Sequence, residues 1–228
     1  MNEDLQANTP AFFTLDGFDG ALAKRMLPVI QDALQYNTEA WTTLVANEPN
    51  LRERLKSQGL ETPDRFNSIR WDQATLLFTS GMAVTNEHLP LQIGERLTRE
   101  RFGRFPHKDG SALGYFLEHI RPNRSITDND GEDMYDNIVS LITQLAEGLT
   151  EAHQGHQQYE SGFGGLQLLG YLTPDEVSDL RKLLAGRSWT VSFDEPLDGG
   201  IADVAKHFTT LLKAAERRRV GLVHRRHR

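Results

Sequence analysis

Residues 173–186 of the chain read Thr-Pro-Asp-Glu-Val-Ser-Asp-Leu-Arg-Lys-Leu-Leu-Ala-Gly. Threonine is a favourable helix N-cap, proline is accepted at the first helical position, and a glutamate three residues after the cap completes a capping box. The apolar residues that follow lie on one side of a helix, and Gly186 can end it. This stretch therefore predicts an amphipathic helix with two well-defined ends.

Helical spacing also marks the segments on both sides of this stretch. An apolar stripe runs through 132–153 and consists of Tyr135, Ile138, Ile142, Leu145 and Leu149. A second stripe predicts a final helix over 201–215. The glycine-rich residues 155–170 are expected to form a loop. Residues 189–193 alternate apolar and polar side chains, which predicts a strand, and residues 220–224 are expected to pair with it.

The first half of the chain also favours helices. They are expected over 22–33, 38–46, 51–58, 71–78 and 89–101, with a loop over 102–110. Pro28 should kink or break the first of them, because proline lacks a backbone N–H. The predicted fold class is mostly α (α+β): a multi-helix domain over 1–228 with a small two-stranded β element near the C-terminal end. Two lobes, 1–124 and 125–228, are the alternative organisation.

The composition narrows the classes of function. Hydrophobic residues make up 38% and charged residues 25%, as in ordinary globular proteins. The absence of cysteine excludes disulfides, thiolate zinc sites and a cysteine nucleophile. No apolar stretch approaches the ~20 residues of a membrane helix, and the acidic start does not look like a secretory signal. A cytoplasmic protein that does not enter a membrane is therefore expected.

Charge is distributed unevenly along the chain, whose formal net charge is −7. Residues 125–180 contain eleven acidic side chains and no lysine or arginine. The start of this segment is the most acidic part, with Asp128, Asp130, Glu132, Asp133 and Asp136. These acids suit the positive end of a helix dipole, and they can also pair with basic residues of the same chain. The alternative is a negative surface that binds a basic protein partner, where complementary charge speeds encounter and selects the partner.

Basic residues gather in two other places. Arg99, Arg101 and Arg104 alternate with phenylalanines between residues 99 and 108, and Arg225 and Arg226 belong to an arginine-rich end. Such patterns can bind nucleic acid or another anion. The structural alternative is a loop anchored in the core by its phenylalanines, together with a basic tail that neutralises the acidic segment or lies in solvent.

Histidines offer one further hypothesis. His153 and His156 lie close to Glu151 and Glu160, a combination that can ligate a metal ion. Their spacing matches neither the H-E-x-x-H motif nor the Glu-x-x-His pairs of di-iron bundles. No cofactor is expected on this basis, and a metal-assisted enzyme at these histidines remains an alternative.

The C-terminal part resembles a known family. Gly170-Tyr171-Leu172-Thr173-Pro174-Asp175-Glu176-Val177, followed by a late helix and the apolar Val220-Gly221-Leu222-Val223, is similar to YfbM-like uncharacterised bacterial proteins. The resemblance covers about 55 residues, 170–224. It implies a helix that leads into a strand. Some proteins of this family are suspected toxin-immunity proteins. It supplies no catalytic motif.

These observations favour a non-catalytic cytoplasmic interaction protein whose acidic segment binds a basic partner, as an immunity-type inhibitor would. Two alternatives stay open. One is a nucleic-acid or anion binder that uses residues 99–108 and the last arginines, and the other is a metal-assisted enzyme around His153 and His156.

Overall fold

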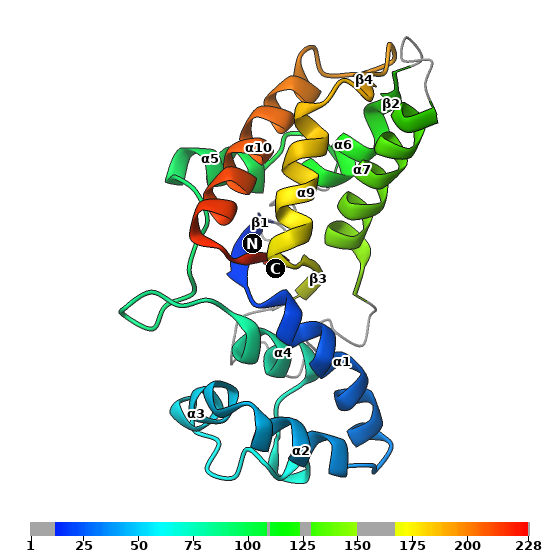
Figure 1. The fold of residues 1–228 in the computed structure, drawn as a ribbon. Helices are drawn as coiled ribbons and strands as arrows, with labels where there is room; N and C mark the ends of the chain where they lie inside the picture. Colours follow the sequence, from blue (N-terminus) through cyan, green and yellow to red (C-terminus); the bar gives the residue numbers. More distant parts are fainter. Residues whose placement is uncertain (1–11, 109, 124–128, 150–166, 228) are drawn as a thin grey trace, which may run out of the picture.

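A computed structural model describes residues 12–108, 110–123, 129–149 and 167–227 (Figure 1). Its helices are α1 (Gly20–Leu34), α2 (Glu39–Asn47), α3 (Pro49–Ser57), α4 (Gln73–Gly81), α5 (Arg96–Gly103), α6 (Ala112–His119), α7 (Asn129–Glu147), α9 (Pro174–Ala185) and α10 (Gly200–Arg218). Its strands are β1 (Phe12–Phe18), β2 (Ile120–Pro122), β3 (Gln167–Leu172), β4 (Trp189–Val191) and β5 (Gly221–His227). The predicted fold class, mostly α with small β elements, is confirmed.

Strand β5 forms the centre of a three-stranded antiparallel sheet, with β1 on one edge and β3 on the other. The predicted pairing of 189–193 with 220–224 is wrong, because β4 pairs with β2 in a separate two-stranded sheet. Burial explains the difference. Leu222 and Val223 in β5 are fully buried on opposite faces, as in a central strand, whereas Thr190 and Val191 in β4 are exposed.

Two strands of the larger sheet, β1 and β3, were not predicted from the sequence. Strand β1 contains the buried polar residues Thr14 and Asp16, which hide the usual apolar pattern. Strand β3 begins at Gln167, inside the stretch 155–170 that was predicted to be a glycine-rich loop. Its Gly170 is needed for close packing, because a Cβ there would lie 2.0 Å from the carbonyl oxygen of Gln144 in α7.

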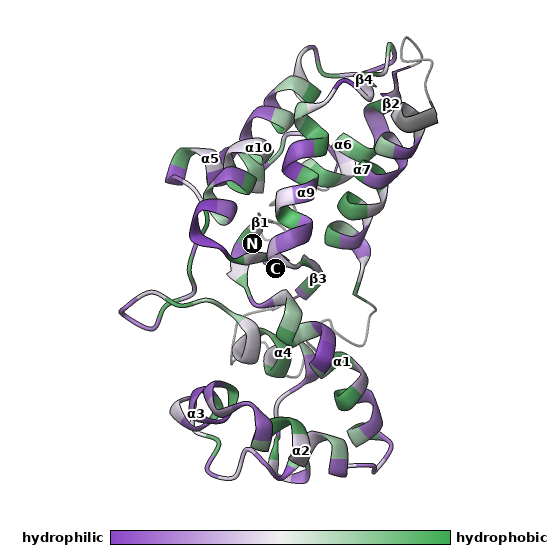
Figure 2. Cartoon of the chain, viewed as in Figure 1, coloured by the Kyte–Doolittle hydropathy of each residue, from purple (hydrophilic) through white to green (hydrophobic). Residues whose placement is uncertain are grey.

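The sheet separates two hydrophobic clusters. Leu222 belongs to the cluster that α5, α6, α7, α9 and α10 build on one side, and Val223 belongs to the cluster built with α1 to α4 on the other. Figure 1 shows these two groups of helices above and below the sheet. Apolar positions alternate with polar ones along the helices, as Figure 2 shows. The sheet also joins β1, from the first alternative lobe, to β3 and β5 from the second.

The helix ends show where local signals were sufficient. The capping box of α9 is confirmed, since Thr173 Oγ1 accepts from the Glu176 N–H at 3.3 Å and Glu176 Oε2 accepts from the Thr173 N–H at 2.7 Å. Helix α1, in contrast, runs through Pro28. Proline is tolerated there because both it and Lys24, whose carbonyl loses its partner, face solvent.

The helix predicted over 89–101 begins only at Arg96. Before it, Leu91 forms backbone hydrogen bonds with Ala83 and Gly17, and Gly94 adopts a positive φ of 81° that turns the chain into the helix. Within the described parts of the chain, every helix is too short or too polar to cross a lipid bilayer.

Candidate metal centre

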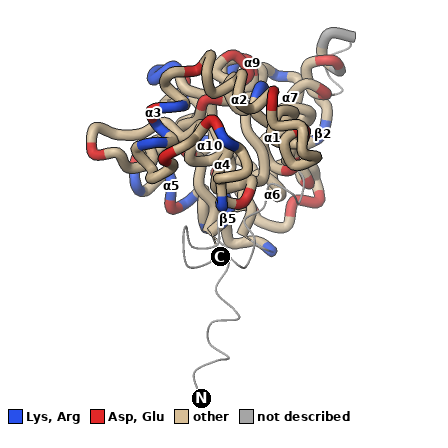
Figure 3. The backbone as a smooth tube through the Cα atoms, turned by 90° about the horizontal axis from the view of Figure 1, so that it is seen from below, with Lys and Arg blue, Asp and Glu red and all other residues tan. Residues whose placement is uncertain are grey.

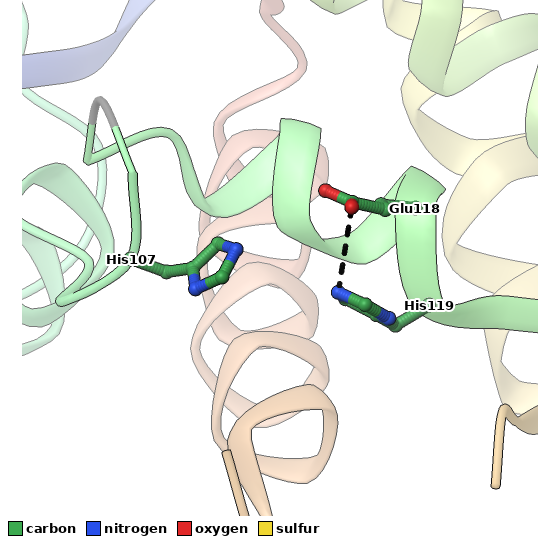
Figure 4. Close-up of side chains that lie close together, drawn as sticks. All are labelled: His107, Glu118 and His119. Carbon is green, nitrogen blue, oxygen red and sulfur yellow. Dashed lines mark ion pairs between the residues drawn. The ribbon is translucent and has the colours of Figure 1, made fainter. Parts of the chain in front are cut away.

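Three potential metal ligands meet where helix α6 ends. Glu118 and His119 are the last residues of α6, which Ser111 caps by accepting a hydrogen bond from the Gly114 N–H at 3.1 Å. His107 reaches them from the preceding loop. Figure 4 shows its imidazole directed towards the space beside Glu118 and His119. One ligand atom from each residue can be chosen so that all three lie within 4.8 Å of one another.

The loop that carries His107 is fixed by its own turn and by the core. The His107 N–H donates to the Phe105 carbonyl and the Gly110 N–H donates to the His107 carbonyl, each at 2.8 Å. Phe105 and Phe102 are buried in the hydrophobic core. Phe102 anchors the end of α5 and Phe105 anchors the loop, as the structural alternative for this segment expects, and this positions His107 beside α6.

His119 is the most unusual side chain of the three. It is only 7% exposed, and neither of its ring nitrogens has a hydrogen-bond partner among the described residues. The same holds for Nε2 of His107. Buried polar atoms are normally hydrogen-bonded, and leaving one unsatisfied costs about 1–3 kcal/mol. A metal ion bound to one ring nitrogen would satisfy the lone pair of that nitrogen, while the other nitrogen carries the proton.

Glu118 supplies the negative charge of the cluster. Its Oε1 lies 4.0 Å from Nε2 of His119, and Lys108 Nζ donates to Oε1 at 2.6 Å. The hydrogen bond from Lys108 is the main cause that lowers the pKa of Glu118, and the charge of the ammonium adds to it. The carboxylate is therefore ionised at neutral pH and suited to bind a cation.

The three ligands suit zinc. Two histidines and one glutamate form a known ligand set of catalytic zinc sites, which leave a fourth position for water or substrate. Ligand atoms bound ~2.1 Å from one tetrahedral ion lie ~3.4 Å apart. The present separation of up to 4.8 Å therefore has to shrink by roughly 1–1.5 Å, through side-chain rotation, before the three atoms can share an ion.

Tyr115 packs against both imidazoles. Its ring centroid lies 4.9 Å from that of His107 and 4.6 Å from that of His119. Its hydroxyl donates to Glu195 Oε1 at 3.0 Å, and burial raises its pKa to about 12. Tyr115 is therefore neutral and already engaged elsewhere, so it serves as packing between the ligands and does not ligate the metal itself.

A cavity of about 490 Å³ opens beside the cluster. His107 and Glu118 line it together with Lys108, Phe13 and Arg226. A metal ion held by the cluster would consequently lie at the wall of a space large enough for a small molecule.

The five arginines predicted to bind anions do not form one site. Arg99 donates to the Gly94 carbonyl at 3.0 Å, and Arg225 pairs with Asp16. Arg101 and Arg104 line a second cavity near the start of α10. Arg226 lines the cavity of the candidate metal centre. The expectation of a basic tail in solvent is wrong, because Arg225 and Arg226 belong to the central strand β5.

The predicted acidic site is only partly described. Asp133 and Asp136 are exposed on α7, and neither takes part in an ion pair with the residues that the structure describes. Asp128 lies outside the described residues, and only the backbone is described for Asp130 and Glu132. Figure 3 shows acidic and basic positions together around α5.

The metal site predicted from the sequence, at His153 and His156, stays a prediction. His153 and His156 lie outside the described residues. Sequence reasoning missed the cluster of His107, Glu118 and His119, since the first two lie eleven positions apart. The available signal was the pair Glu118-His119 at the end of an apolar helix, directly before a strand, where a buried histidine needs a partner.

Comparison with protein-family models, with curated proteins and with solved structures finds no match for this chain. The resemblance of residues 170–224 to YfbM-like proteins therefore stays a prediction.

Proposed function

We propose that the protein binds one zinc ion through His107, Glu118 and His119, with a coordination position left open towards the adjacent cavity. The observation that carries this proposal is the burial of His119, whose ring nitrogens form no hydrogen bond with the described residues and whose Nε2 lies 4.0 Å from Glu118 Oε1. Nitrogen ligands favour zinc over magnesium and calcium, which prefer oxygen. Three protein ligands with an open position are typical of catalytic centres, where the ion polarises a carbonyl or activates water.

Lys108 does not oppose this proposal. Its side chain is 59% exposed and donates to Glu118 at the edge of the cavity. A long, exposed lysine side chain can turn into solvent at little cost, and exposed ion pairs contribute at most about 1 kcal/mol. A divalent ion with two imidazole ligands can therefore replace the ammonium at Glu118.

The test is a measurement of zinc stoichiometry and affinity by equilibrium dialysis with metal analysis. We expect one zinc ion per chain in the wild type. His119→Phe, which keeps an aromatic ring but removes both nitrogens, should weaken binding by more than about a hundredfold, because a direct ligand matters at least as much as a residue that hydrogen-bonds to a ligand. Unchanged zinc binding in His119→Phe would refute the proposal.

Two control variants make the result specific. His88→Asn removes an exposed imidazole at a position with φ of 61°, where asparagine is tolerated, and should leave zinc binding unchanged. The double variant His153→Asn/His156→Asn should also bind as the wild type does. If the double variant alone loses zinc, the metal site lies at residues 153 and 156 instead.

A second function is favoured by the exposed acids of α7. We propose that this protein is a cytoplasmic interaction protein. The segment around Asp133 and Asp136 would bind a basic protein partner, as an immunity-type inhibitor does. The supporting observation is that both carboxylates are exposed and form no ion pair within the described part of the chain, while no lysine or arginine occurs from 125 to 180.

This second proposal predicts a strong dependence on ionic strength. Binding to poly-lysine, measured by fluorescence anisotropy, should weaken as salt is added, because exposed charges are screened over about 10 Å at moderate salt. At a fixed salt concentration, Asp133→Asn/Asp136→Asn should weaken poly-lysine binding relative to the wild type. The matched variant Asp32→Asn/Glu61→Gln, which removes two exposed acids elsewhere, should weaken it less. Equal binding by both variants would contradict it.

A further inference from the structure

Arg226 is placed in an unusual way for an arginine of a central strand. It faces Phe13 of β1 and Gln167 of β3 in the register of the sheet, and its guanidinium carbon lies 5.8 Å from the centroid of the Phe13 ring. Its Nε is buried and has no hydrogen-bond partner among the described residues, nor does the side chain form an ion pair with any of them. The neighbouring Arg225, in contrast, is paired with Asp16.

Arg226 lines the cavity beside the candidate metal centre. Lys108 lies on the same wall, as do the carboxylates of Glu118 and Glu147. With a divalent ion bound, the ion and Arg226 outweigh the two carboxylates even when Lys108 has turned into solvent. A cavity with an excess of positive charge attracts anions, and its confined volume makes the attraction stronger than in open solvent.

We infer that this cavity binds a small oxyanion, a carboxylate or phosphate group, whose oxygens contact the metal ion on one side and the Arg226 guanidinium on the other. The inference rests on the proposed zinc site. Guanidinium groups present two parallel N–H donors that match the oxygens of carboxylates and phosphates. The open coordination position of the metal accepts a further oxygen ligand.

The dimensions of the cavity define the ligand more closely. A volume of about 490 Å³ suits a small molecule, in the usual range of ligand pockets. Phe13, Ala146 and Leu169 provide apolar wall beside the charged groups. The expected ligand is thus a small organic acid or phosphate ester with an apolar part, and the shared recognition chemistry is the oxyanion.

The test uses the full chain loaded with cobalt(II), whose visible absorption reports changes in its coordination. Inorganic phosphate and acetate are titrated separately, so that the tighter of the two identifies the oxyanion. We expect both titrations to change the cobalt spectrum of the wild type. Arg226→Gln should weaken anion binding by about tenfold or more, as expected when a charged hydrogen bond worth ~1.5–3 kcal/mol is lost.

Arg104→Gln is the matched control. Arg104 also lies over a phenylalanine ring, at 4.9 Å from the centroid of Phe12, but it lines a different cavity. Anion binding should be unchanged in this variant. Arg226→Lys keeps the charge but loses the two parallel N–H donors of the guanidinium, and it should bind anions with intermediate affinity. That result would show that the weaker anion binding of Arg226→Gln does not come from a folding defect.

The outcomes separate the two proposals. Cobalt binding with anion titrations that are identical in the wild type and Arg226→Gln overturns the oxyanion inference and leaves the metal proposal intact. The absence of any spectral change with phosphate and acetate has the same consequence. A wild-type chain that does not bind cobalt or zinc overturns both.

Discussion

Arg225 donates to a single oxygen of the fully buried Asp16: its Nε lies 3.0 Å and its Nη2 2.9 Å from Oδ2 of that carboxylate. Thr14 Oγ1 donates to the same oxygen at 2.9 Å. The guanidinium also lies over the ring of Phe78, 4.7 Å from its centroid. The ion pair thus connects β1 and β5 inside the core, and Arg225 is engaged in the fold itself.

Arg225→Met should strongly destabilise the protein. The substitution leaves the Asp16 carboxylate buried without its cation, and breaking a buried pair in this way costs about 3–5 kcal/mol. Chemical denaturation measures the loss, and Arg217→Met, at an exposed position of α10, should change the free energy of unfolding by less than about 0.5 kcal/mol. Asp16→Leu/Arg225→Met should be more stable than Arg225→Met alone. Equal stability of Arg225→Met and the wild type would show that the pair does not support the sheet.

His227 makes stability depend on pH. Burial is the main cause that lowers its pKa from 6.5 to about 4, and the charge of Arg225 adds to it. Between these values the unfolded chain binds a proton that the folded chain does not, so the free energy of unfolding falls as pH decreases from about 6.5 to about 4. Because the ring is partly accessible to solvent, we expect a total loss of roughly 1–2 kcal/mol.

The measurement for His227 is a comparison of denaturation curves across this pH range with those of His227→Gln. Glutamine can still hydrogen-bond to Thr14 Oγ1, which lies 3.0 Å from Nε2 of the histidine, and it does not titrate. The difference in stability between the two proteins should therefore change with pH in favour of the variant as the solution becomes more acidic. A difference that is constant over the range would assign the acid sensitivity to other groups.

The parts of the fold that could be predicted are those controlled by local chemistry. The cap at Thr173, the helices along α7 and α10, and the overall excess of helix follow from side-chain spacing and end signals. Strand partners depend on contacts between distant segments instead. The pairing of β5 with β1 brings Thr14 opposite Arg225, a relationship across the whole chain that no local pattern contains.

The candidate site was less predictable for a similar reason. The loop around His107 is anchored by Phe105, as expected, yet its histidine becomes important only because α6 places Glu118 and His119 next to it. Arg226 was predicted to bind anions as part of a basic tail, and its role as an anion ligand stays a prediction. Its position at a cavity wall follows from the sheet, which the sequence analysis did not predict.

Thr173→Ala tests the clearest local signal. The variant removes the hydroxyl that accepts from the Glu176 N–H, and the loss of such an N-cap costs about 1 kcal/mol. Thr210→Ala, at an exposed position within α10, should instead be neutral or slightly stabilising, because alanine has the higher helix propensity. Thermal and urea denaturation of both variants measure the difference, and equal effects would mean that the cap does not control α9.

His119→Phe should separate folding from metal binding. Without metal, the variant should be more stable than the wild type by about 1–2 kcal/mol, because it no longer buries two unpartnered nitrogens. With zinc, the order should reverse, since a ligand at a hundred times its dissociation constant stabilises only the wild type, by about 2.7 kcal/mol. Denaturation with and without zinc measures both effects. A metal-free His119→Phe that is strongly destabilised would indicate that the nitrogens are satisfied by other partners.

Lys108→Met tests the competition for Glu118. The ammonium of Lys108 donates to Oε1 of this carboxylate at 2.6 Å, and a zinc ion that binds there must displace it and tolerate its charge nearby. The variant should consequently bind zinc about two- to tenfold more tightly, because an exposed pair worth up to about 1 kcal/mol no longer has to be broken. Lys56→Met, which removes an exposed lysine in α3, should leave the zinc affinity unchanged. Competition titrations with a chromophoric chelator give both dissociation constants, and weaker zinc binding in Lys108→Met would mean that the lysine supports the site by orienting Glu118 and does not compete with the metal ion.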